Sequence, residues 1–257
     1  MSTFTGKSVV VTGATSGIGR AAALEFARRG ADVLLVGRSA SALEDVAIEA
    51  MAAGSKPGVC VADVTEDGAA ERIVSMAVNG SRGGIDVLVN AAGVIATGTM
   101  EATSDATWDQ MMNVNVRGPF RLMRAAAPHL KARHGNVVNV SSVNGLRAFA
   151  GVLAYNVSKA AMDHLTRCAA LEMAPFGVRV NCVNPGVTIT NLHRRGGMND
   201  TQYAAFLERA KETHPLGRPG QPEEVAAMIL FLASDEAKWM TGETIPVDGG
   251  RHLTCLR

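Results

Sequence analysis

A tyrosine and a lysine four residues apart, Tyr155 and Lys159, could together carry out proton transfer. Residues i and i+4 of a helix share one face, so the Lys159 ammonium can lie beside the Tyr155 phenol. A free phenol has a pKa of about 10, and a neighbouring positive charge lowers that pKa toward the range that acid–base catalysis needs. A surface Tyr–Lys pair gives the same spacing. The pair becomes a candidate active site because Ser142 lies thirteen residues before Tyr155 and Asn115 forty residues before it.

These side chains would be positioned by alternating apolar strands and amphipathic helices. Residues 8–12 and 32–36 predict two strands that flank a glycine-rich turn and a helix at about 18–29, and further Val- and Leu-rich runs follow at 58–61, 85–89, 136–140, 178–183 and 243–247. Amphipathic stretches occur at 40–53, 67–77, 107–132, 154–174 and 222–233. Strands that are apolar throughout and alternate with helices form a parallel sheet covered on both faces. The sequence therefore predicts an α/β, three-layer Rossmann fold with a single doubly wound, mostly parallel seven-stranded sheet.

The whole chain, 1–257, is expected to form one dinucleotide-binding and catalytic domain, because α/β architectures of this length are commonly single units. Its least regular part, 187–219, follows the sixth predicted strand. Ligands of doubly wound sheets bind beyond the carboxyl ends of the strands. Segment 187–219 is therefore a candidate substrate lid.

Composition argues against several classes of function. The 25 basic and 24 acidic residues give a formal charge of +1, which does not suggest a nucleic-acid partner. No apolar run approaches the roughly 18 residues of a membrane span. The widely spaced Cys60, Cys168, Cys182 and Cys255 form no Cys/His cluster, so we expect reduced thiols and no metal site. The N-terminus shows no basic-then-apolar leader, and we expect a cytoplasmic protein.

A glycine-rich string, 12–19, falls between the first predicted strand and the first predicted helix. Gly13 permits a tight turn, Gly17 lets the backbone approach a pyrophosphate, and Gly19 allows the helix to pack close to the sheet. The amide groups at the start of the helix, around Thr15, Ser16 and Ile18, would then face the anion. A plain strand–helix turn is the alternative reading of this string.

The second predicted strand favours NADP over NAD. A NAD site usually has an acidic residue after this strand, whereas this chain reads Val-Gly-Arg-Ser at 36–39. Arg38 could pair with a 2′-phosphate, and Ser39 could add a hydroxyl donor. Ser16 weakens the argument because it supplies no second positive charge. Asp63, followed by Val64, could accept a hydrogen bond from an adenine amino group or could cap a helix.

Taken in order, these motifs resemble the short-chain dehydrogenase/reductase family in its compact, single-domain form. The string 12–19 is similar to that family's TGxxxGxG signature, and Asn90 to Gly93 resembles its NNAG element, with Ala91 in place of the usual second Asn. Residues 184–190 resemble its PGxxxT stretch, and 215–218, 231–234 and 247–250 match its usual C-terminal strings. The resemblance covers nearly the whole chain, and it is closest in pattern to the 3-oxoacyl-carrier-protein reductase and sugar or alcohol dehydrogenase branches.

The resemblance implies a role for each candidate residue. Tyr155 would be the general acid in carbonyl reduction, Ser142 would donate a hydrogen bond to the substrate oxygen, and Lys159 would lower the Tyr155 pKa and bind the nicotinamide ribose. Asn115 would help to hold a water, although it could instead simply cap or bridge strands within 113–115, and Ser141 competes with Ser142 for the hydroxyl role. Further cofactor contacts would come from Pro185, Gly186, Thr188 and Thr190. Relatives of this kind are commonly homotetramers, and the apolar last strand could join such an interface.

The substrate is expected to be a small carbonyl or alcohol with an apolar part. The candidate pocket residues are mainly apolar: Val143, Asn144, Leu146, Phe149, Val152, Val187, Leu192, His193, Met198, Tyr203 and Phe206. Arg194 and Arg195 could meet a carboxylate or phosphate, or could simply be solvated. Two other functions stay open from sequence, a catalytically silent nucleotide-binding regulatory or scaffold protein and a sugar-nucleotide epimerase or dehydratase.

Overall fold

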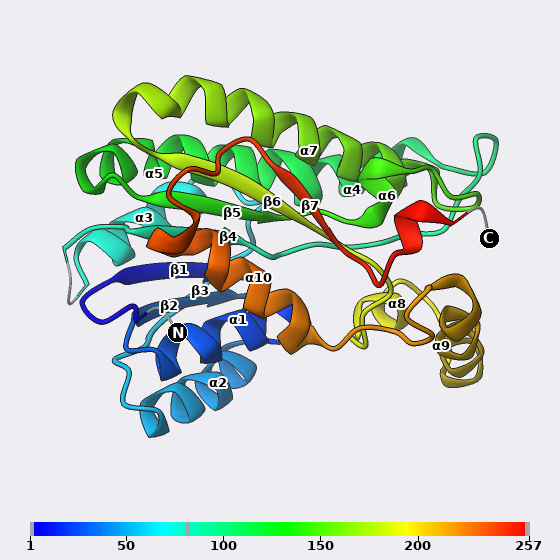
Figure 1. Cartoon of the computed structure of the whole chain (residues 1–257), viewed down its shortest axis with the longest axis horizontal. Helices are drawn as coiled ribbons and strands as arrows, with labels where there is room; N and C mark the ends of the chain where they lie inside the picture. The colour runs from blue at the N-terminus through cyan, green and yellow to red at the C-terminus, as the bar shows by residue number, and fades with distance from the viewer. Residues whose placement is uncertain (1–2, 81–82, 255–257) are drawn as a thin grey trace.

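The computed structural model describes residues 3–80 and 83–254. Its strands form one seven-stranded sheet in the order β3-β2-β1-β4-β5-β6-β7, in which every neighbouring pair is parallel (Figure 1). The strands are β1 (Ser8–Thr12), β2 (Asp32–Gly37), β3 (Gly58–Val61), β4 (Val87–Asn90), β5 (Asn136–Val140), β6 (Arg179–Pro185) and β7 (Thr244–Val247). The predicted α/β Rossmann fold is confirmed, and the sheet is parallel throughout rather than mostly parallel.

Helices cover both faces of this sheet (Figure 1). One face carries α1 (Gly17–Arg28), α2 (Ala40–Ala52) and α10 (Pro222–Ala233). The other face carries α3 (Ala69–Val78), α4 (Asp105–Met112), α5 (Gly118–Arg133) and α7 (Leu153–Met173). The remaining elements are the helix α9 (Asp200–Thr213), the short helices α6 (Val143–Leu146) and α8 (Leu192–Arg195), the π-helical η1 (Asn113–Arg117), and the 3-10 turns η2 (Ala174–Phe176), η3 (Asp235–Ala237) and η4 (Arg251–Leu253).

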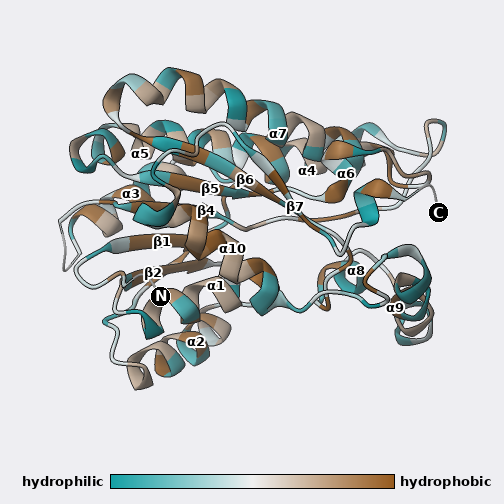
Figure 2. Cartoon of the chain, viewed as in Figure 1, coloured by the Kyte–Doolittle hydropathy of each residue, from teal (hydrophilic) through white to brown (hydrophobic). Residues whose placement is uncertain are grey.

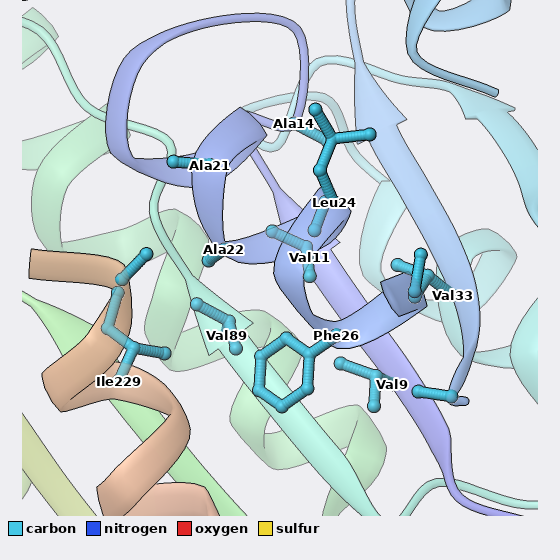
Figure 3. Close-up of a cluster of buried hydrophobic side chains, with 14 of the residues drawn as sticks. Val9, Val11, Ala14, Ala21, Ala22, Leu24, Phe26, Val33, Val89 and Ile229 are labelled. Atoms are coloured by element: carbon cyan, nitrogen blue, oxygen red, sulfur yellow. The ribbon is translucent and has the colours of Figure 1, made fainter. Parts of the chain in front are cut away.

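The core consists of two apolar layers, one on each side of the sheet. Figure 2 shows the central strands mostly in hydrophobic colours, and all five residues of β1 are buried. In Figure 3, Phe26 of α1 lies between Val9 of β1 and Val89 of β4, with Ile229 of α10 nearby. Each Å² of apolar surface removed from water stabilises the fold by about 25 cal/mol. Because these strands are buried on both faces, apolar residues are favoured at nearly every position, which explains the near-continuous apolar runs in the sequence.

The stretch 107–132 differs from its prediction. The pattern suggested one continuous amphipathic stretch, but the structure has α4, the π-helical η1 and then α5. Pro119 supplies part of the reason, because it has no N–H to donate to the carbonyl of Asn115 four residues earlier, as an uninterrupted α-helix would require. A π-helical turn inside a helix often marks a functional site.

Segment 187–219 leaves the sheet after β6 and contains α8 and α9, which Figure 1 places together at one end of the molecule. His214 fastens the start of this segment. Its Nδ1–H donates to the Ala210 carbonyl at 2.8 Å, and its Nε2 accepts from the Val187 N–H at 3.1 Å. A parallel bridge between Thr188 and Gly220 joins the two ends of the segment. The two ends of the segment are therefore held to each other.

No helix within the described residues has both the length and the apolar character needed to cross a membrane. The same residues contain no group of three or more His, Cys, Asp or Glu side chains placed to hold a metal ion. Cys60, Cys168 and Cys182 are free thiols, and Cys255 lies outside the described residues.

Candidate active site

Tyr155 and Lys159 lie on α7, and each is only 5% exposed. The Lys159 ammonium is 5.6 Å from the centroid of the Tyr155 ring, so the two side chains share one face of the helix as the spacing predicted. The ammonium also donates to the Val140 carbonyl at the end of β5, at 2.9 Å. This bond holds the lysine at the carboxyl end of a central strand.

The protonation of this pair differs from the sequence expectation. Burial raises the pKa of Tyr155 to about 12, and the hydrogen bond with Ser142 opposes this shift only in part. Burial also lowers the pKa of Lys159 to about 8, against the stabilising negative charge of Asp163. The expected lowering of the Tyr155 pKa by Lys159 is therefore outweighed by desolvation, which disfavours the phenolate. At neutral pH the phenol carries its proton and is ready to donate it.

The two neighbouring serines have distinct partners. Ser142 is the N-cap of α6, where its hydroxyl accepts from the Asn144 N–H at 3.2 Å and donates to the Asn144 side-chain oxygen at 3.1 Å. It also lies close enough to Tyr155 to oppose the rise in the pKa of the phenol. Ser141 instead donates to the Lys159 carbonyl at 3.0 Å and so ties β5 to α7. Of the two hydroxyls, that of Ser142 is the one that acts on the pKa of the phenol.

Asn115 lies in η1 and is 1% exposed. Its side chain accepts from the Val94 N–H at 2.9 Å and donates to the Val94 carbonyl and to Ser158, both at 3.0 Å. It therefore bridges the loop after β4 to helix α7, rather than capping or bridging strands as in the alternative that the sequence left open. Its side chain does not line the cavity described below.

A buried polar network behind Lys159 was missed by the sequence analysis. Asp163, one turn beyond Lys159, accepts from the Asn184 side chain at 3.0 and 2.9 Å and from the Cys182 thiol at 3.6 Å. Burial raises the pKa of Asp163, and the hydrogen bonds and Lys159 lower it in part. The i, i+4, i+8 spacing of Tyr155, Lys159 and Asp163 on α7 was the signal that could have found it.

A cavity of about 1400 Å³ runs past these residues along the carboxyl ends of the strands. Most of the predicted cofactor and substrate residues line it: Gly13, Thr15, Ser16, Gly17, Ile18, Gly19, Arg38, Asp63, Val64, Ala91, Gly93, Ser142, Val143, Asn144, Phe149, Val152, Tyr155, Lys159, Pro185, Gly186, Val187, Thr188, Thr190, Leu192, His193, Met198 and Phe206. Ser39, Asn90, Asn115, Leu146 and Tyr203 do not line it. The topology thus brings together residues from all along the chain.

The glycine turn has the shape of a phosphate cradle. Gly13 and Gly17 have φ angles of +68° and +55°, and a Cβ on Gly19 would come within 2.4 Å of the Gly13 carbonyl oxygen. A Cβ on Gly13 would likewise come within 2.9 Å of the Ala91 carbonyl oxygen. These glycines keep the turn tight and the start of α1 open, so the residues present suit a dinucleotide pyrophosphate.

The loop after β4 is held against this turn. The Thr12 hydroxyl accepts from the N–H groups of both Ala91 and Ala92 at 3.1 Å. Asn90 is buried and donates to the Asn139 side chain at 2.8 Å. Ala91 makes its bond through the backbone, so replacement of the usual Asn side chain leaves this contact intact.

Arg38 and Asp63 lie together at one end of the cavity. The Arg38 guanidinium is 3.7 Å from the Asp63 carboxylate, and its side chain is 69% exposed. Asp63 does not cap α3, whose N-cap is Gly68, but accepts from the N–H and hydroxyl of Thr65 at 2.9 and 2.7 Å. Ser39 caps α2 by accepting from the Ala42 N–H at 3.3 Å, so its side chain serves the helix.

The structure separates Arg194 from Arg195. Arg194 pairs with Asp200 at 3.0 Å and lies over the Tyr203 ring at 4.0 Å. Arg195 lines the cavity and donates to the Ser16 hydroxyl of the glycine turn at 3.1 Å. The second positive charge that Ser16 lacks is therefore brought beside it by Arg195 of segment 187–219.

His193 lines the same cavity beside Phe206, with ring centroids 4.4 Å apart. Burial lowers the pKa of His193 to about 4, so the imidazole is neutral at physiological pH. Tyr203, expected near the substrate, instead exchanges hydrogen bonds with the backbone of Thr190 at 2.9 and 3.2 Å. Tyr203 therefore supports the wall of the cavity from behind.

Comparison with known proteins identifies the family. The chain matches the family model described as Enoyl-(Acyl carrier protein) reductase over residues 13–252. It is 39% identical over 250 residues to 3-oxoacyl-acyl-carrier-protein reductase FabG of Thermotoga maritima, covering 95% of this chain and 97% of that protein. It is 38% identical over 247 residues to meso-2,3-butanediol dehydrogenase of Serratia marcescens, covering 96% and 95%.

A solved structure of the same fold is also similar to this chain. A short-chain dehydrogenase/reductase of unknown function from Caenorhabditis elegans, solved with cofactor, has a TM-score of 0.92 at 35% identity and covers 98% of this chain and 97% of its own. The chain belongs to the short-chain dehydrogenase/reductase family. It is an oxidoreductase that acts on alcohol and carbonyl groups, so the predicted family and enzyme class are confirmed over the scaffold alternative.

Proposed function

We propose that the protein interconverts a carbonyl and a secondary alcohol with NADP(H), using Tyr155 as the general acid and base. The observation that carries this proposal is the buried, protonated Tyr155 phenol, which lines one cavity together with Ser142 and the glycine turn. A bound nicotinamide supplies the hydride. The side chains of the protein supply the proton and stabilise the substrate oxygen.

In the direction of reduction, the carbonyl carbon gains a hydride and its oxygen gains the Tyr155 proton. Ser142 donates a hydrogen bond to the same oxygen as negative charge develops there. Lys159, mostly protonated below its pKa of about 8, places a positive charge behind the resulting phenolate and is free to bind ribose hydroxyls. In oxidation the phenolate takes the proton back, and each group reverses its role.

Asn115 acts in this scheme as a positioning residue. Its bonds to Val94 and Ser158 fix the loop beside Gly93 relative to α7. Pro119 offers no N–H to the Asn115 carbonyl, which supports a role for that carbonyl in holding the water predicted beside Lys159. After Tyr155 has given up its proton, a new proton would reach it from solvent through this water and Lys159.

The preference for NADP over NAD follows from the charge at the cofactor end of the cavity. Arg38 replaces the usual acidic residue after β2, and Arg195 adds a second cation at the glycine turn. Guanidinium groups bind phosphate with two parallel N–H···O bonds. The 2′-phosphate of NADP would therefore form charge-assisted hydrogen bonds that the bare ribose of NAD cannot form. Asp63 would then be available to the adenine amino group.

The substrate side is proposed to be covered by segment 187–219, acting as a lid. Val187, Leu192 and His193 of this segment line the cavity opposite Asn144 and Phe149. We propose a small carbonyl with an apolar part as the substrate. The likeness to a butanediol dehydrogenase and to an acyl-carrier-protein reductase supports this size range.

The proposal also covers the oligomeric state and the cellular location of the protein. β7 is an edge strand whose four residues are only half-buried, which supports a homotetramer joined through this edge. The free thiols of Cys60, Cys168 and Cys182 support a reducing compartment such as the cytoplasm. Light scattering of the purified protein would measure the subunit number directly.

The test of the proposal is hydride transfer across a panel of ketones, acyl thioesters, sugars and secondary alcohols with each reduced or oxidised nicotinamide cofactor. Absorbance of the reduced ring reports turnover. Turnover of a ketone or secondary alcohol is expected. Isomerisation of a sugar nucleotide without net change in the cofactor would instead support the epimerase alternative.

The cofactor preference has its own test. Arg38→Asp should weaken NADPH binding by about tenfold or more and NADH binding much less, because only the former loses a charge-assisted phosphate contact. Fluorescence titration of the variant with both cofactors gives the two dissociation constants. Equal weakening of both would show that Arg38 does not read the 2′-phosphate.

A further inference from the structure

The charges that line the cavity are unbalanced. Among the described lining residues, the cations are Arg38, Arg147, Lys159, Arg195, Arg209 and Arg251, and the one carboxylate is Asp63. The proposed cofactor accounts for part of this excess, because Arg38, Arg195 and Lys159 lie at the glycine turn and ribose positions. Arg147, Arg209 and Arg251, which we call the arginine cluster, remain without a role in the proposed reaction.

The arginine cluster is held together at the substrate end. Arg147 follows α6 directly and donates to the backbone carbonyls of Arg251 and His252 at 3.3 and 3.0 Å, and to that of Thr254. The Arg251 guanidinium lies 4.7 Å from the ring centroid of Phe149. Arg209 reaches the same cavity from α9. Three separate parts of the fold thus converge on one end of the cavity.

Two guanidinium groups of the cluster, those of Arg147 and Arg251, have no carboxylate partner among the described residues. The Arg251 Nη1 atom is buried without a hydrogen-bond partner. Asp248 is nearby, but its carboxylate already accepts from the N–H of Gly250, and from the N–H and ring of His252. Burial and the charges of Arg147 and Arg209 together lower the pKa of Arg251.

A buried guanidinium donor without an acceptor is unfavourable unless a ligand supplies one. We propose that the substrate carries a carboxylate or phosphate group, and that the arginine cluster binds it while the carbonyl lies at Ser142 and Tyr155. This inference rests on the proposed function and names its substrate class. Four residues of α6 separate Ser142 from Arg147, a helical rise of roughly 6 Å, so the anionic group lies several bonds from the carbonyl.

A substrate with a carbonyl at one end and an anionic group at the other explains why both apolar side chains and arginines line this end of the cavity. Phe149, Leu192 and Phe206 would contact the carbon chain between the two polar ends of the substrate. Arginine suits the anionic end better than lysine does, because its planar fork matches carboxylate and phosphate oxygens.

The experiment measures equilibrium binding to the NADP⁺-loaded protein, in which a ketone cannot be reduced. The probes are 5-oxohexanoate, its methyl ester and 5-oxohexyl phosphate, titrated by calorimetry. At least one of the two anions is expected to bind about tenfold or more tightly than the ester, since a hydrogen bond to a charged group has about this effect. The better of the two anions identifies the group that the arginine cluster recognises.

Two variants and one control locate the effect. Arg251→Gln and Arg209→Gln should each reduce the preference for the anion over the ester toward unity. Arg28→Gln removes the same charge from an exposed side chain, 58% accessible and outside the cavity lining, and should keep the preference. Retained NADP⁺ affinity shows that each variant is folded.

The outcomes separate the two proposals. Equal affinity for the anions and the ester, or a preference that survives both variants, overturns the anion site while leaving carbonyl reduction in place. Failure of both anions to bind the cofactor-loaded protein also overturns it. Failure of the protein to bind any nicotinamide cofactor, or to transfer hydride in the substrate panel, would instead count against the proposed function.

Discussion

At the scale of single residues, burial decides what Tyr155 does. An exposed phenol beside an ammonium would lose its proton more easily, but a buried one keeps it, and here burial raises the pKa to about 12. Such a group is a ready acid for reduction. As a base it depends on Lys159, whose own pKa of about 8 is kept from falling further by the negative charge of Asp163.

The residue-scale prediction concerns the phenol itself. Tyr155→Phe removes the transferable proton and little else, so kcat for carbonyl reduction should fall by about 100-fold or more, within the usual contribution of general acid catalysis. Steady-state reduction assays give kcat, and fluorescence titration gives the NADPH dissociation constant, which should change little. A variant that keeps at least about half of the wild-type kcat, with chemistry limiting the rate, would remove Tyr155 from its role.

At the scale of elements, segment 187–219 contacts the start of α1. Arg195 of α8 donates to Ser16 at the start of α1, while its neighbour Arg194 is occupied by Asp200 and Tyr203. Gly17 contributes to the same junction, because a Cβ there would lie 3.0 Å from Thr190 Cγ2. A pyrophosphate at the glycine turn would therefore lie beside a cation supplied by the proposed lid.

This junction predicts different effects for two adjacent arginines. Arg195→Ala should weaken NADPH binding by about tenfold, because it removes a charge beside the cofactor phosphates. Arg194→Ala is the matched control, and it should change NADPH binding by less than about twofold, since an exposed ion pair contributes little. Fluorescence titration measures both. Equal effects of the two substitutions would show that the Arg195–Ser16 contact is not part of the cofactor site.

At the scale of the whole molecule, stability is linked to the protonation of buried histidines. Burial lowers the pKa of His193 to about 4, and that of His214 is lowered in the same direction. Between the ordinary histidine pKa of about 6.5 and the lowered value, the unfolded chain binds more protons than the folded one. The folded state should therefore lose stability as pH falls through this window.

For His193 alone, the expected loss between about pH 7 and about pH 5 is at most about 2 kcal/mol in the free energy of unfolding. Urea denaturation of wild-type protein at the two pH values measures the total loss. His193→Gln keeps a polar side chain that does not titrate, so its loss over the same interval should be smaller. An identical loss in the variant would assign the pH dependence to other groups.

Much of this molecule was determined by the sequence alone. The apolar strands, the glycine string after β1 and the spacing of Ser142, Tyr155 and Lys159 predicted the sheet, the turn and the pair on α7, because these depend on local periodicity and short separations. The prediction was less accurate where distant residues decide the outcome. The π-helical turn at Asn115 depends on bonds to Val94 and Ser158, and Tyr203 faces Thr190 rather than the cavity.

Only the tertiary structure decided which distant residues the arginine side chains contact. Arg195 reaches Ser16 across 179 residues, and Arg147 contacts the backbone of Arg251 across 104. No local pattern encodes such contacts, because they arise when parallel strands bring the loops at their carboxyl ends to one edge of the sheet. Burial has the same origin, and so the pKa of Tyr155 was set by the packed fold, whereas its place beside Lys159 was set by four residues of helix.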